Sequence, residues 1–430
     1  MIGLIMFVSA LILLLLGFPV AFVFGTVAVL FAALFPEIGL EVFSLLPFRI
    51  YGIMQNFTLM AVPLFIMMGL VLEKTKMAEE LLESMGRLFG GIRGGLAVSI
   101  VVVGAILAAA TGIVGASVVM MSLISLPIMI KHGYDSKLAS GTIAASGTLG
   151  QIIPPSIVLI VLGDVMSVSV GDLFKAAVIP GLILVGLYIA YILTVAWLKP
   201  QSAPAIKSEK PGKEIVIDVF KSVIPPLLLI FAVLGSIFFG IASPTESAAV
   251  GVIGALLLSI LNRSFSLEML KYASLETVKL TSMIFMILIG ATAFSLVFNE
   301  ADGGDLVLEF FSEDIGDVWV FIFAAMAAIF ILGFFVDFVE ICFIVVPILV
   351  PIVEEFGIDP IWFAILIAMN LQASFLTPPF GFSLFYLKGA AGKLVKTGEI
   401  YKGVIPFIAL QIIALVIIIV FPELVWVFVE

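Results

Sequence analysis

Hydroxyl and amide side chains gather around two double prolines in a chain that is otherwise strongly apolar. They are Ser146, Thr148 and Gln151, with Gly147 among them, before Pro154 and Pro155, and Asn370, Gln372, Ser374 and Thr377 before Pro378, Pro379 and Gly381. Proline frees backbone carbonyls within a helix, and hard oxygen donors suit alkali ions and not soft metals. We therefore expect Na⁺ and an anionic substrate to bind at these breaks. The alternative is that the kinks and hydroxyls only help the helices to pack.

Two carboxylates lie deep in an apolar stretch, three residues apart, at Asp337 and Glu340. A charge there is costly, so it should face an aqueous cavity, an ion or a polar partner, unless this is a solvated turn near the outer surface. We take Asp337 as a candidate and leave Glu340 open. An intramembrane enzyme using both as an acid/base pair is the alternative. However, no nucleophile and base accompany them, and a single Cys and a single His exclude a multi-His/Cys metal site.

The two breaks belong to an internal repeat. Pro127, Gly133 and Asp135 precede the first double proline, and residues of the same types precede the second at a constant spacing of 224, namely Pro351, Gly357 and Asp359. Broken spanning segments at matching positions in two halves point to the binding site of a secondary transporter.

Composition places the chain among multi-pass membrane proteins, since 63% of its residues are hydrophobic and 12% are charged. Because the first basic residue is Arg49, the N-terminal apolar run is expected to span the membrane and not to be a cleaved signal. The net charge of −10 leaves no basic face for nucleic acid. We predict crossings at 2–17, 18–35, 50–72, 138–162, 176–198, 222–241, 243–261, 280–299, 360–387 and 403–421. Two further apolar stretches are interrupted, 95–130 at Thr111, Gly112 and Gly115, and 318–352 at Asp337.

Charge predicts the topology. Basic residues, which mark the cytoplasmic side, follow the third crossing (Lys74, Lys76, Arg87, Arg93) and the first interrupted stretch (Lys131, Lys137), and they recur in the linker 199–221. The matching places in the second half are acidic, and no Lys or Arg occurs from 280 to 387. We therefore predict inverted repeats over 1–198 and 222–430, joined by a cytoplasmic linker at 199–221, with both termini outside. Each repeat then needs an odd number of crossings, five plus one re-entrant hairpin.

Smaller features complete this prediction. Amphipathic helices are expected at 73–90, 264–279 and 303–312, either on the bilayer surface or packed on neighbouring spans. Glu246, after Ser243 and Pro244, is expected to cap a helix. No Lys or Arg falls inside a predicted crossing. The charge of an anionic substrate must then be met by Na⁺, helix N-termini, amides and hydroxyls, or by a lysine that reaches in from a boundary.

Several motifs together resemble the large membrane subunit of tripartite ATP-independent periplasmic (TRAP) transporters, the DctM type. They are PIMIKHGYD from Pro127, AASGTLGQIIPPS from Ala144, SVSVGDLF from Ser167 with IPG from Ile179, PTE from Pro244, LTPPFG from Leu376, and LMAVPLF from Leu59 with Gly69. The resemblance covers essentially all 430 residues.

The resemblance implies an all-α importer of organic acids in the bacterial inner membrane, driven by Na⁺ and using no other cofactor. Its partners would be a separate small four-helix membrane subunit, a periplasmic binding protein that delivers the substrate, and lipid. An elevator mechanism would carry hairpin tips at Thr111-Gly112, with Gly115 and Ser117, and at Asp337, in a transport domain moving against a scaffold, each drawn from both repeats. A stand-alone Na⁺/anion symporter of the same fold class is the alternative.

Two positions depart from the family pattern. The first tip usually reads Ser-Gly-Ser, and here it reads Thr111-Gly112-Ile113, while Glu340 replaces a small or apolar residue. These departures favour 2-oxo, hydroxy or aromatic acids as substrates over C4-dicarboxylates or sialic acid.

Overall fold

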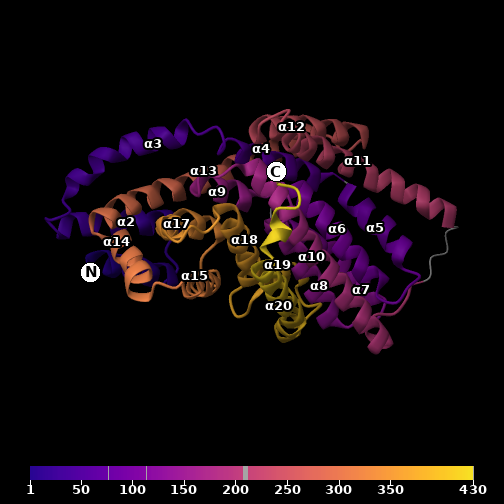
Figure 1. Ribbon diagram of the computed structural model, residues 1–430. Helices are drawn as coiled ribbons and strands as arrows, with labels where there is room; N and C mark the ends of the chain where they lie inside the picture. The colour runs from indigo at the N-terminus through magenta and orange to yellow at the C-terminus, as the bar shows by residue number, and fades with distance from the viewer. Residues whose placement is uncertain (76, 113, 207–211, 430) are drawn as a thin grey trace.

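The protein is built entirely from helices, as the sequence predicts. The computed structural model describes residues 1–75, 77–112, 114–206 and 212–429, apart from the side chain of Thr111, and contains no strand within them (Figure 1). Lys76, Ile113 and residues 207–211 of the expected linker therefore lie outside the described part.

The helices of the first half range from 9 to 29 residues in length. They are α1 (Ile2–Leu15), α2 (Val20–Leu34), α3 (Leu46–Met54), α4 (Ala61–Lys74), α5 (Met77–Phe89), α6 (Gly95–Thr111), α7 (Val114–Lys131), α8 (Ser136–Thr148), α9 (Ile157–Val165) and α10 (Val170–Leu198). A short 3₁₀ turn, Leu149–Gln151, follows α8 and precedes the first double proline.

The second half contains a further series of helices, from α11 to α20. Its helices are α11 (Gly212–Phe238), α12 (Pro244–Leu261), α13 (Leu267–Glu300), α14 (Gly303–Glu309), α15 (Val318–Leu332), α16 (Phe338–Glu340), α17 (Val346–Glu355), α18 (Pro360–Leu376), α19 (Phe382–Ala391) and α20 (Thr397–Val420). A π-helical segment, Ile341–Val345, joins α16 to α17.

The spacing of 224 residues reappears in the helix starts. α2 and α12, α7 and α16, and α8 and α18 begin 224 residues apart. The repeated aspartates explain part of this, because Asp135 accepts hydrogen bonds from the N–H groups of Lys137 and Leu138, and Asp359 does the same for Ile361 and Trp362. Both therefore cap the helix that leads to a double proline. The opposite orientation of the two halves stays a prediction.

Three predicted boundaries differ from the structure. The crossing expected at 50–72 is divided between α3 and α4, because the Asn56 side chain accepts from the N–H groups of Thr58 and Leu59 and competes with the helical bonds. The amphipathic helix expected at 264–279 and the crossing at 280–299 form one continuous helix, α13. Residues 212–221, expected in the linker, form the first turns of α11.

The helices pack in two groups. In the first group, α13 lies against α2 and α4, and α12 lies against α4 and α11. In the second group, α20 packs on α8, α10 and α18, and α7 packs on α8 and α19 (Figure 1). Each group draws helices from both halves of the chain. We call them the outer group (α1, α2, α4, α11–α13) and the inner group (α6–α10, α15–α20).

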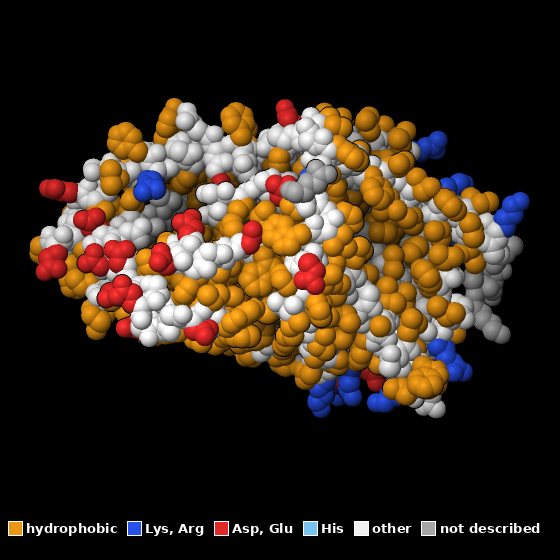
Figure 2. Space-filling model, in the orientation of Figure 1, with side chains coloured by type: hydrophobic (Ala, Val, Ile, Leu, Met, Phe, Trp, Pro, Cys, Tyr) orange, Lys and Arg blue, Asp and Glu red, His pale blue; other side chains and the backbone are white. Residues whose placement is uncertain are grey.

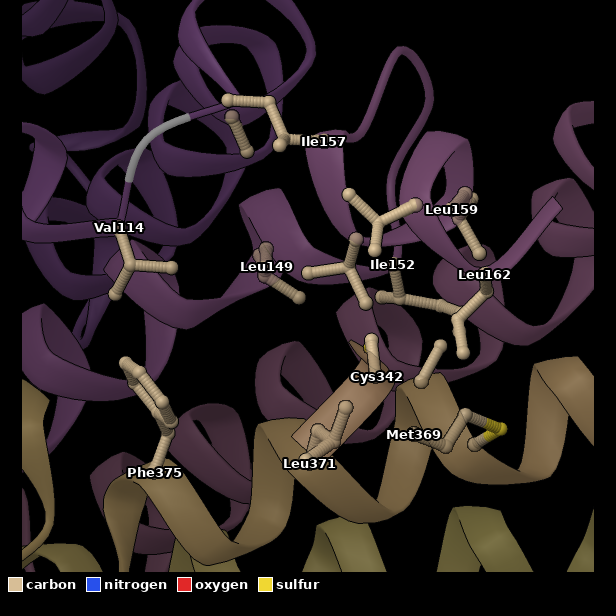
Figure 3. Close-up of a cluster of buried hydrophobic side chains, with 14 of the residues drawn as sticks. Val114, Leu149, Ile152, Ile157, Leu159, Leu162, Cys342, Met369, Leu371 and Phe375 are labelled. Atoms are coloured by element: carbon tan, nitrogen blue, oxygen red, sulfur yellow. The ribbon is translucent and has the colours of Figure 1, made fainter. Parts of the chain in front are cut away.

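Apolar side chains from both halves fill the interior of the inner group. Figure 3 shows Leu149 and Ile152 of the first half facing Cys342 and Leu371 of the second, and all four are fully buried. In a bilayer such close packing holds helices together, since lipid tails are as apolar as these side chains.

The surface has the pattern of a membrane protein. Figure 2 shows broad hydrophobic areas between acidic side chains gathered at one end, over α14 and α17, and basic side chains at the opposite end and along one edge. Within the described ranges, six helices are long and apolar enough to cross a membrane, among them α10, α13 and α20.

Candidate functional site

A cavity of about 120 Å³ lies where both interrupted stretches meet. It is lined by Ile66 of α4; Gly112, Val114 and Gly115 at the α6–α7 turn; Ile157 of α9; Leu280, Met283 and Ile284 of α13; Asp337, Phe338 and Val339 at the second turn; Phe375 of α18; and Tyr386 of α19. Figure 3 shows Val114 and Phe375 on one side of this region. Two segments 224 residues apart in sequence thus form one site, which we call the tip cavity.

Gly112 brings the first tip close to the first break. Its φ of +61° ends α6 in the left-handed region, and its N–H donates to the Ala108 carbonyl. A Cβ at this position would lie 3.3 Å from the Pro155 carbonyl oxygen. Glycine therefore permits both the turn and the approach to the double proline.

Gly115 brings the same tip close to the second break. A Cβ there would lie 2.9 Å from Cζ of Tyr386, whose helix, α19, follows Pro378-Pro379. The ring of Tyr386 thus forms the wall of the cavity at a place where the glycine leaves room for it.

Asp337 is the only charged side chain that lines the tip cavity among the described residues. Its Oδ1 accepts from the N–H of Phe338 at 2.7 Å, so it caps the short helix α16. The side chain is half-buried, and one carboxylate oxygen has no hydrogen bond to a described residue. It can therefore cap the helix and still face a cation in the cavity.

Glu340 faces a different place. Its side chain is 5% exposed and lines a small gap together with Phe7, Leu11 and Phe24 of α1 and α2. Its Oε2 has no hydrogen-bond partner in the described part of the chain. Because Asp337 and Glu340 line separate cavities, the geometry gives no support to an acid/base pair.

Both double prolines have a cis peptide bond, and the polar residues before them are buried, apart from the half-buried Thr377. Thr148 and Gln372, 224 residues apart, contact each other, with Gln372 Nε2 donating to Thr148 Oγ1 at 3.4 Å. Gln411 Nε2 of α20 donates to the same hydroxyl at 3.4 Å. This contact joins the two breaks at the centre of the inner group.

Several buried polar atoms near the breaks have no partner among the described residues. They are Oγ of Ser146, both amide atoms of Gln151 and Oε1 of Gln372. A buried polar atom without a partner costs about 1–3 kcal/mol, so an ion or water that satisfies these oxygens is expected.

The other predicted residues have structural contacts. Asn370 Nδ2 donates to the Met326 carbonyl at 2.7 Å, and the hydroxyls of Ser374 and Thr377 donate to carbonyls of their own helix. Gly147 packs against Val118, and Ser117 is buried outside the cavity wall. The Thr111 side chain lies outside the described part.

Comparison with known proteins identifies the family. The model of the family described as "Tripartite ATP-independent periplasmic transporter, DctM component" matches residues 7–424. The chain belongs to the DctM family. It is therefore a membrane component of a transporter and not an enzyme, and it resides in the bacterial inner membrane.

Relatives of this DctM chain are similar to it in sequence over most of its length. The C4-dicarboxylate TRAP transporter large permease protein DctM of Pseudomonas aeruginosa is 30% identical, over 87% of this chain and 86% of the relative. The ectoine TRAP transporter large permease protein TeaC of Halomonas elongata is 29% identical, over 96% and 95%. The solved structure of the Alcanivorax borkumensis YdaH transporter shares the fold, with a TM-score of 0.66 at 12% identity over 98% and 99% of the two chains.

The structure of the DctM chain adds residues that sequence reasoning missed. Tyr386, Phe375 and Ile157 line the tip cavity, and α4 and α13 complete it from the outer group. The position of Tyr386, five residues after Gly381 and just beyond the second break, was the one available signal. The apolar residues of α13 carry none, because they resemble any lipid-facing side chain.

Proposed function

We propose that the chain is the large permease subunit of a Na⁺-coupled importer of an organic acid, working with a small membrane subunit and a binding protein outside the membrane. The observation that carries this proposal is the tip cavity, where two turns from matching positions in the two halves meet around Asp337. The family supports the three-part assembly, and the site chemistry supports Na⁺.

Na⁺ binding is supported by the oxygen atoms around the breaks. Ser146, Gln151 and Gln372 offer buried oxygens without partners among the described residues, and Asp337 offers a carboxylate at the cavity wall. Hard oxygen donors of this kind suit Na⁺. Clusters of three or more His, Cys, Asp and Glu side chains, which would hold a transition metal, are absent from the described residues.

An anionic substrate is supported by charge balance. No Lys or Arg lines the tip cavity within the described residues, so a bound carboxylate needs Na⁺ and backbone N–H groups as counter-charges. Ile157, the first residue of α9, lines the cavity and places a helix N-terminus there. Relatives named for C4-dicarboxylate and ectoine transport both carry compounds with a carboxylate, which fits this balance.

The wall of the tip cavity is shared between the outer and the inner group, which suits alternating access. Ile66 and the α13 residues belong to the outer group, and the tips belong to the inner group. We infer that the inner group slides along α13 and carries the site across the membrane, as an elevator does.

Na⁺-dependent uptake in proteoliposomes that contain all three components tests this function. We expect Asp337→Asn to raise the Na⁺ concentration for half-maximal uptake at least tenfold, because asparagine keeps the helix cap and removes the charge. Asp317→Asn is the matched control, since Asp317 caps α15 through the N–H groups of Trp319 and Val320 away from the cavity.

A second pair tests the break itself. Thr377→Ala should weaken Na⁺ dependence, whereas Thr194→Ala, which removes the same hydroxyl-to-carbonyl bond of 2.7 Å in α10, should not. Unchanged Na⁺ dependence and affinity in both Asp337→Asn and Thr377→Ala would show that the ion binds elsewhere.

A further inference from the structure

A second cavity, of about 220 Å³, lies further along α13. The outer group supplies Thr292, Ser295 and Asn299 of α13, and Arg49 of α3 lies beside them. The inner group supplies Asp164 at the end of α9 and Phe343 of the second hairpin. Like the tip cavity, it therefore lies between the two groups of helices.

Both cavities use one face of α13. Leu280 and Ile284 line the tip cavity, and Leu288, Thr292 and Ser295 line the second, at the spacing of three and four residues that places side chains on one face. At about 1.5 Å per residue, Ile284 and Thr292 are roughly 12 Å apart along the helix. The stripe changes from apolar to polar toward Asn299, at the end that the charge distribution predicts to be outside.

Arg49 gives this cavity a cation that the tip cavity lacks. Its side chain is exposed and forms no ion pair with a described residue. Lys175, the other basic side chain on the predicted outer side, is paired with Asp172 at 3.7 Å. Among the described residues on that side, Arg49 is thus the cation that is free to meet an incoming anion.

Asp164 limits which anion fits. It lines the same cavity, and its Oδ1 accepts a hydrogen bond from Asn56 Nδ2, which fixes the carboxylate in place. A ligand with one carboxylate can place it on Arg49, while a second carboxylate would be repelled by Asp164. Leu288 and Phe343 add an apolar part to a wall that also carries the polar side chains of α13.

We infer that this cavity is a receiving site for the incoming substrate, in which the guanidinium of Arg49 binds the single carboxylate of a small aliphatic or aromatic monocarboxylate. The inference rests on the proposed function and narrows its substrate class. Arginine suits this role because its planar fork can hold both carboxylate oxygens. The ligand then moves to the tip cavity, whose largely apolar wall accepts the rest of the molecule.

Uptake kinetics in three-component proteoliposomes test the inference, with benzoate, 2-oxobutanoate and succinate as probes under a fixed Na⁺ gradient. We expect the wild type to transport a monocarboxylate in preference to succinate. Arg49→Ala should raise the KM for that acid at least tenfold, and Arg49→Lys should fall between, since it keeps the charge but loses the fork. Lys175→Ala, a control that removes a cation on the same side, should stay within twofold of the wild type.

Two more measurements separate the possible failures. Ser295→Phe, which fills the cavity from α13, should raise the KM as Arg49→Ala does, while thermal stabilisation of both variants by Na⁺ should match the wild type. Wild-type protein without Na⁺-dependent uptake of any acid would overturn the proposed function. Wild-type uptake that Arg49→Ala leaves unchanged would overturn the receiving site alone, and a preference for succinate would overturn the monocarboxylate assignment.

Discussion

Gly147 illustrates how tightly the first break is packed at the scale of single residues. A Cβ at this position of α8 would lie 2.2 Å from Cγ2 and 3.2 Å from Cα of Val118, and both residues are buried. Gly147→Ala should therefore push α7 away from α8 and destabilise the protein by about 1–3 kcal/mol. The measurement is the thermal unfolding midpoint of purified protein in detergent.

Gly186 provides the matched control within the same group of helices. It lies in α10, is exposed, and has no atom within 4 Å of a Cβ built on it. Gly186→Ala should raise the stability by roughly 0.5–1 kcal/mol, since alanine favours the helix. An equal effect of the two substitutions would mean that packing against Val118 does not constrain the break.

Residue types predicted the turns at the two tips better than the other residues that line the tip cavity. Gly112, Gly115 and Asp337 all line the tip cavity. The sequence marks them as candidates because they interrupt apolar stretches, and hydropathy detects such interruptions directly. Tyr386 and Arg49 could not be selected in this way. Their roles depend on which helices meet in space, and one sequence carries no record of that contact.

At the scale of elements, the capping box that begins α12 is confirmed. Ser243 Oγ accepts from the Glu246 N–H at 3.3 Å, and Glu246 Oε2 accepts from the Ser243 N–H at 2.8 Å. A carboxylate in this first turn also interacts favourably with the N-terminal end of the helix dipole.

Glu246→Gln should consequently lower the free energy of unfolding by about 0.5–1 kcal/mol, because glutamine keeps an oxygen for the Ser243 N–H but loses the charge beside the helix N-terminus. Glu37→Gln, which removes a charge from the exposed loop after α2, is the control and should stay within about 0.5 kcal/mol of the wild type. Thermal unfolding of the three proteins in detergent checks both expectations. An unchanged stability of Glu246→Gln would mean that the charged cap does not stabilise α12.

Element boundaries were predictable where the chain contains a helix breaker or an N-cap, and not elsewhere. Asp135 and Asp359 fixed the starts of α8 and α18, and each helix ends before its double proline, α8 at Thr148 and α18 at Leu376. Hydropathy could not separate α3 from α4, because one side chain, Asn56, makes the division. Hydropathy also divided α13 wrongly into an amphipathic helix and a crossing. The composition changes from amphipathic to apolar at residue 280, but the helix does not break there.

At the scale of the whole molecule, the tip cavity and the receiving site both lie between the two groups of helices. Sliding of one group along α13 would therefore alter both cavities together. The hydrogen bond from Asn56, just before α4, to Asp164 of α9 joins a segment next to the outer group to the inner group and would have to break in that movement. A covalent bond at the same place should consequently hold the protein in one state.

Cross-linking of Asn56 to Asp164 can therefore test the elevator movement. In a background in which Cys342, the only cysteine, is replaced by serine, oxidation of the pair Asn56→Cys and Asp164→Cys should stop Na⁺-driven uptake, and reduction should restore it.

The control is the pair Ser236→Cys and Ser247→Cys. The hydroxyl oxygens of Ser236 and Ser247 lie 2.8 Å apart and join α11 to α12 within the outer group. That disulfide should leave uptake unchanged, because its two helices move together. Each protein is compared with its own reduced form, which removes the effect of the substitutions themselves. Full uptake by the oxidised Asn56–Asp164 pair would mean that the two groups do not slide past each other here, and transport would then require a different movement.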